Sequence, residues 1–114
     1  MAKISDELLT TIFCLKRQLA EQIETASATE WAILDRYGET SETMTELDEL
    51  YKVREKLTER YLGLNNLLLR ILEIQPVAPR AMLDLLVQSV ERGQATAYAS
   101  QASIEEVKRN WNLL

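Results

Sequence analysis

Three carboxylates with helical spacing are the residues best placed to do chemistry in this sequence. Glu42, Glu46 and Glu49 are separated by four and three positions, which places them on one face of a helix. Carboxylates spaced in this way on antiparallel helices can hold Mg²⁺, as in all-α nucleotide pyrophosphatases. Such a site needs further carboxylates from a second helix, and only Glu30 and Asp35 are near enough. We therefore favour a solvated acidic face, and a magnesium-dependent all-α hydrolase is the second alternative function.

Other reactive groups are scarce. The sequence has no histidine, which excludes histidine-dependent catalytic triads, the usual zinc sites and the Glu-x-x-His ligands of di-iron bundles. Cys14 is the only cysteine, so no internal disulfide can form, and it lies opposite the apolar stripe of its helix. The three glycines are too far apart for a phosphate-binding loop. We expect an incidental exposed thiol, no metal, no cofactor and no catalysis.

The charge distribution points to a protein partner. A net charge of -5 argues against nucleic acid and against an anionic membrane surface. Residues 21–49 carry nine acidic side chains against one basic side chain, whereas residues 50–80 carry six basic against three acidic. We expect Glu21 and Glu24 to pair with the bases of residues 54–60, which leaves residues 30–49 as an acidic tip. We favour a tip that is simply solvated. The alternative is a contact surface, with Glu42, Glu46 and Glu49 as candidate partner-binding residues, that would speed association with a basic protein. The alternative function is therefore an acidic inhibitor or regulator.

Two further charges, Glu30 and Arg54, stand inside otherwise apolar stripes. In a hairpin folded at Gly38 they lie within a turn or two of each other. We expect them to form a buried polar layer that sets the register of the helices.

The elements that carry these residues are long helices, because 3 Gly and 2 Pro leave few places to break the chain. The apolar periodicity predicts a helix over about 5–37, capped by Ser5 and ended by Gly38. A second helix over about 41–74 stops before Pro76. The short turn between them predicts an antiparallel hairpin. Apolar residues of the second helix recur every seven positions, as in a coiled coil: Leu50, Leu57, Leu64 and Ile71.

Two shorter helices are expected after the hairpin. The third runs over about 80–93, with Pro79 at its start and its end near Gly93 or in the alanine-rich stretch 95–102. Ser103 and Glu106 have the spacing of a capping box, which predicts a short final helix over about 104–113. The apolar face of this helix consists of Ile104, Val107, Trp111 and Leu114. We favour a lid over the apolar base of the hairpin, and the alternative is a recognition helix that inserts into a partner's groove.

These observations predict a single all-α domain over residues 1–114 that is completed as a larger bundle by dimerisation. The apolar arc of the first helix covers about half of its circumference, more than one neighbouring helix requires. Phe13 and Trp31 lie on the flank that the second helix does not face, so they are candidates for the dimer interface. We expect a non-enzymatic protein–protein interaction module, an adaptor, assembly factor or chaperone-like protein, that acts as a homodimer and binds an unidentified protein partner. Asp6 and Glu7 stand where a signal peptide would turn apolar, and no run of membrane-spanning length follows, so we expect a cytoplasmic protein.

Overall fold

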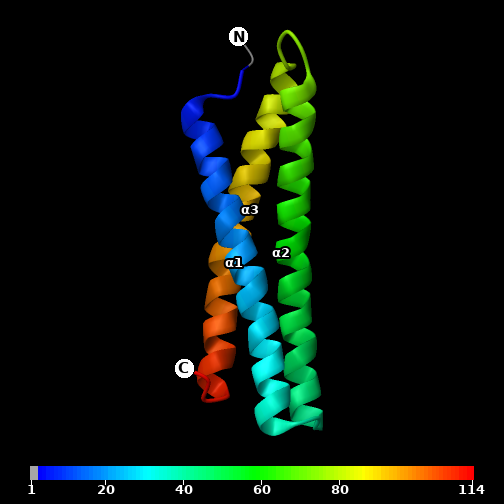
Figure 1. Cartoon of the computed structure of the whole chain (residues 1–114), viewed down its shortest axis with the longest axis vertical. Helices are drawn as coiled ribbons and strands as arrows, with labels where there is room; N and C mark the ends of the chain where they lie inside the picture. The colour runs from blue at the N-terminus through cyan, green and yellow to red at the C-terminus, as the bar shows by residue number, and fades with distance from the viewer. Residues whose placement is uncertain (1–2) are drawn as a thin grey trace.

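The computed structural model describes residues 3–114 and is built from three long helices (Figure 1). These are α1 (Asp6–Tyr37), α2 (Ser41–Glu73) and α3 (Arg80–Asn110), and they form an elongated bundle of 56 × 19 × 16 Å. Successive helices run in opposite directions, so the turn after α1 and the loop before α3 lie at opposite ends. The expected all-α class is confirmed. Within residues 3–114, no helix combines the length and the apolarity that a membrane span requires.

The ends of α1 and the start of α2 follow from local capping. The Ser5 hydroxyl accepts a hydrogen bond from the Leu8 N–H, which confirms Ser5 as the N-cap. Gly38 ends α1 with a φ of 71°, a conformation that glycine adopts without strain. Thr40 and Thr43 then form a reciprocal capping box at the start of α2.

The prediction of two separate helices over 80–93 and 104–113 is wrong, because α3 is one continuous helix of 31 residues. Gly93 does not end a helix but lies buried in its interior. A Cβ atom at that position would stand 2.9 Å from Cδ2 of Leu15, so the missing side chain lets α3 approach α1 closely. The alanine-rich stretch 95–102 continues the helix because alanine is the strongest helix former. Ser103 is consequently an exposed residue in mid-helix and caps nothing.

The core runs along the bundle axis in two clusters. The larger one occupies the half near the α2–α3 loop, and the smaller one lies near the turn between α1 and α2. The four heptad-spaced residues of α2 are all buried: Leu50, Leu57, Leu64 and Ile71. Near the meeting of the two clusters, α3 contributes the buried hydroxyl side chains of Thr96 and Ser100, so the centre of the bundle is partly polar.

Candidate interaction site

The acidic residues of α2 do not assemble into a site for a cation. Glu42 and Glu49 are exposed and Glu46 is half-buried, all near the turn at Gly38. No three histidine, cysteine, aspartate or glutamate side chains of residues 3–114 converge on a point. Lys52 approaches Asp48 at 3.2 Å and Glu49 at 4.0 Å, and its hydrogen bond with Asp48 raises the pKa of Lys52. On this face, the carboxylates of Asp48 and Glu49 therefore form ion pairs with Lys52 of the same helix.

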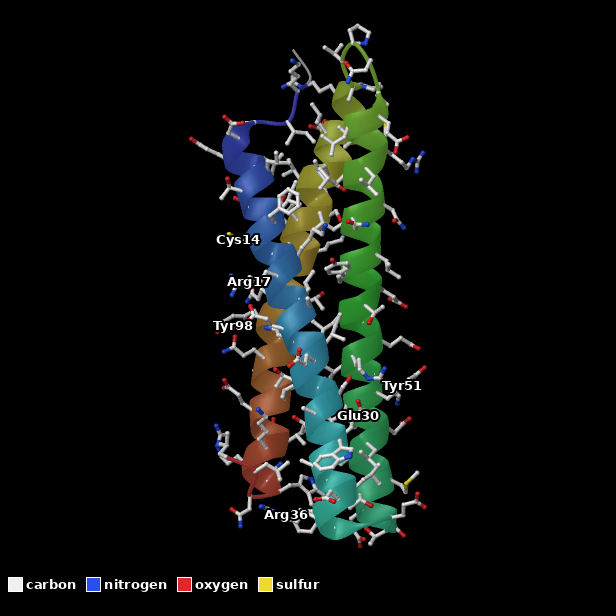
Figure 2. All side chains as sticks on the ribbon, viewed as in Figure 1. Cys14, Arg17, Glu30, Arg36, Tyr51 and Tyr98 are labelled. Carbon is white, nitrogen blue, oxygen red and sulfur yellow. The ribbon has the colours of Figure 1, made fainter. Side chains whose placement is uncertain are left out.

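Glu30 and Arg54 meet across the α1–α2 contact, as their positions inside the two stripes predicted. Arg54 Nε donates to Glu30 Oε2 at 2.9 Å, and the two side chains are 33% and 17% exposed. This hydrogen bond raises the pKa of Arg54. A guanidinium is in any case charged at every physiological pH, so the pair is ionic. The same guanidinium lies 5.0 Å from the ring of Tyr51, which points outward beside Glu30 in Figure 2. The ion pair therefore supports an aromatic side chain at the surface.

A second polar bridge lies further along the same face. Lys16 Nζ of α1 donates to Asn65 Oδ1 of α2 at 2.7 Å. The ammonium group also lies 5.1 Å from the ring of Phe13 and 5.5 Å from the ring of Tyr61. Phe13 is nevertheless 54% exposed, so the bridge orients the ring without covering it.

These two bridges lie beside a partly exposed stripe that repeats every seven residues on both helices. In α1 the stripe consists of Phe13, Ala20, Ser27 and Leu34, with Trp31 between the last two. In α2 the matching stripe consists of Tyr51, Thr58, Asn65 and Leu72. Trp31 is 67% exposed, the highest exposed fraction among the large apolar side chains of the two stripes. Phe13 and Trp31 were predicted from the sequence, whereas the contribution of α2 was not, although the seven-residue spacing of its stripe is visible in the sequence.

The expected pairing of Glu21 and Glu24 with the bases of residues 54–60 does not form. Glu21 instead pairs with Arg17 of its own helix at 3.4 Å, on a fully solvated face. Arg60 donates to the Thr96 hydroxyl of α3 at 3.1 Å. The reason is helical phase, because Glu21 points away from α2 while Arg60 lies on the side of α2 that faces α3.

The C-terminal residues pack at the end of the bundle opposite to the one expected. Ile104 and Val107 are buried in the smaller core cluster, and Trp111 packs half-buried beside it. The Trp111 ring lies edge-on to Tyr37 at 5.0 Å, and Tyr37 Oη donates to the Trp111 carbonyl at 2.6 Å. Because α3 is continuous, it carries Trp111 to the turn between α1 and α2 and away from the thick base of the hairpin. Leu114 is 78% exposed and contributes little to this contact.

Cys14 is exposed on the outer side of α1, where Figure 2 shows it pointing to solvent. The most distinctive surface of residues 3–114 is the outer stripe of α1 and α2. Comparisons with models of protein families, with curated proteins and with solved structures found no match.

Proposed function

We propose that this chain is a non-enzymatic helical protein–protein interaction module that acts as a homodimer through the outer face of α1 and α2. One observation carries the proposal: large aromatic side chains of both helices are exposed on this one face, and Phe13 and Trp31 are aligned along α1 because 18 residues make five helical turns. Phe13, Trp31 and Tyr51 are 54%, 67% and 47% exposed. Soluble monomers rarely expose aligned aromatic residues of this size, whereas interaction surfaces do so regularly.

The arrangement suits a second pair of helices. Heptad stripes on two neighbouring helices form the seam by which helical bundles associate, with small residues admitting the partner's side chains. Ala20, Ser27 and Thr58 provide such small positions between the aromatic ones. A second copy that presents the same face would bury the stripes of both chains in a symmetric interface.

Light scattering coupled to size-exclusion chromatography tests the proposal. The wild-type chain, of 13.1 kDa, should elute at micromolar concentration with twice its chain mass. Trp31→Glu and Phe13→Glu should each give a folded monomer, because a desolvated carboxylate in an apolar interface is costly. Tyr98→Glu is the matched control, since Tyr98 is an aromatic residue of α3 that is 80% exposed and outside the stripe. A monomeric wild type, or a dimer that both stripe variants leave intact, would refute the proposal.

A further inference from the structure

A groove lies between α2 and α3, on the side of α2 away from its outer stripe. It consists of two adjoining hollows of about 470 and 280 Å³ that share Arg60 and Arg92. On α2 the lining extends from Glu49 to Leu67, a distance of about 27 Å at the helical rise. The groove is thus long enough to hold five turns of another helix.

The floor of the groove consists of small residues. Ala95 and Ala99 of α3 line one hollow, and Gly63 of α2 lines the other. A Cβ atom built on Gly63 would meet no atom within 4 Å, so the space above this residue is open. Small residues at such positions let the backbone of a docked helix approach closely.

The walls of the groove are basic in a chain whose net charge is -5. Lys56 and Arg60 stand four residues apart on α2, and Arg92 stands on α3. Of the two acidic residues in the lining, Glu49 approaches Lys52 at 4.0 Å, and Glu59 lies toward the far end. Three bases, none of which makes a salt bridge within residues 3–114, therefore face the central part of the groove.

We infer that this groove binds an acidic amphipathic helix of a different protein. The inference rests on the proposed interaction function and names the chemistry of the partner. Residues such as alanine or leucine would form the face of the docked helix that touches Gly63 and Ala99. Glutamate or aspartate residues four positions apart would pair with Lys56 and Arg60, and another on the opposite flank would pair with Arg92. Charge complementarity selects this occupant, since a basic helix would meet three like charges.

Two synthetic 21-residue peptides serve as probes. Both repeat a heptad with leucine and alanine on the apolar face, flanked by glutamate in one peptide and by lysine in the other. Fluorescence anisotropy of the labelled peptides with the wild-type chain should show that the glutamate peptide binds and that the lysine peptide binds much more weakly or not at all. Equal binding of the two peptides, or no binding of the glutamate peptide, would overturn the inference.

Substitutions then locate the bound peptide. Lys56→Glu combined with Arg92→Glu should weaken binding of the glutamate peptide about tenfold or more, because two attractive contacts become repulsive. Arg17→Glu, at an exposed position of α1 that does not line the groove, is the control for charge and should leave binding unchanged. Ala99→Leu should fill the floor of the groove and prevent binding of the glutamate peptide. Ala102→Leu, which changes an exposed alanine of the same helix outside the groove, should leave binding unchanged. Thermal unfolding checks that each variant is folded.

The two proposals fail separately in this experiment, because the mass of every variant is measured in the same samples. A dimer that binds neither peptide would overturn the groove inference and leave self-association standing. A monomer that binds the glutamate peptide through Lys56 and Arg92 would overturn the proposed self-association and leave the groove inference standing. Loss of the dimer on Ala99→Leu would show that a second copy occupies the groove, and would overturn the inference of a different protein.

Discussion

Leu57 and Leu64 are fully buried at successive heptad positions of α2, within the larger core cluster. Replacing either residue by alanine removes its contacts with α1 and α3 and leaves a cavity that the rigid helices fill only in part. We expect Leu57→Ala and Leu64→Ala each to lower the free energy of unfolding by about 2–5 kcal/mol, measured by urea denaturation. Cys14→Ser, on the exposed side of α1, is the control and should change it by less than about 0.5 kcal/mol. A Cys14→Ser effect as large as that of Leu64→Ala would contradict the helical phase of α1.

The contact made by a single residue could be predicted from the sequence where that residue interrupts a periodic pattern. Glu30 and Arg54 interrupt apolar stripes, and for that reason their pairing was predicted and is observed. Lys16 gave no such signal, because a lysine at the edge of a stripe is ordinary on a solvated helix. Its bridge to Asn65 depends on the distance between two helices, which no pattern within one helix contains.

At the scale of elements, helix ends could be predicted from the sequence where several local signals coincide, but not where a tertiary contact outweighs the local signals. The hairpin helices were placed within one or two residues because strong signals coincide at Ser5, Gly38 and Pro76. In α3 the local signals gave a wrong prediction, since Gly93 suggested the end of one helix and the Ser103–Glu106 spacing suggested the start of another. Gly93 is there because of its contact with Leu15, and this tertiary requirement outweighs the modest cost of glycine within a helix.

Trp111, the C-cap residue of α3, closes the smaller core cluster. We expect Trp111→Ala to lower the free energy of unfolding by about 2–3 kcal/mol, because a half-buried ring and its edge-on contact with Tyr37 are lost. Calorimetry against Leu114→Ala, which removes an exposed side chain, measures the difference. An unchanged unfolding midpoint for Trp111→Ala would mean that this residue does not act as a lid, and would favour the alternative of a recognition helix.

At the scale of the whole molecule, charge is divided between two regions. Acidic side chains gather around the turn between α1 and α2, whereas bases line the groove between α2 and α3. Internal ion pairing accounts for little of this division, because three of the four salt bridges among residues 3–114 are exposed pairs within one helix. The acidic end therefore repels itself, and an anionic partner would be guided away from it and toward the groove.

This self-repulsion can be measured at the two ends of α1, which carry the same side chain in opposite electrostatic settings. Asp6 is exposed in the first turn, where the helix dipole favours a negative charge, and Asp35 is exposed in the last turn, where the dipole and the acidic surroundings oppose it. In low salt, Asp35→Asn should raise the free energy of unfolding by about 0.3–1 kcal/mol, and Asp6→Asn should lower it by a similar amount.

Thermal unfolding at low and at high ionic strength checks this pair of changes. Both shifts should shrink in about 0.5 M salt, where the screening length falls below the spacing of exposed charges, and the wild type itself should melt higher there. Because the two substitutions are chemically identical, loss of side-chain packing or solvation predicts shifts of the same sign at both positions. Opposite signs can arise only from the field at each end of the helix. A lower midpoint for Asp35→Asn would instead mean that the carboxylate makes a stabilising contact that outweighs the repulsion at the acidic end.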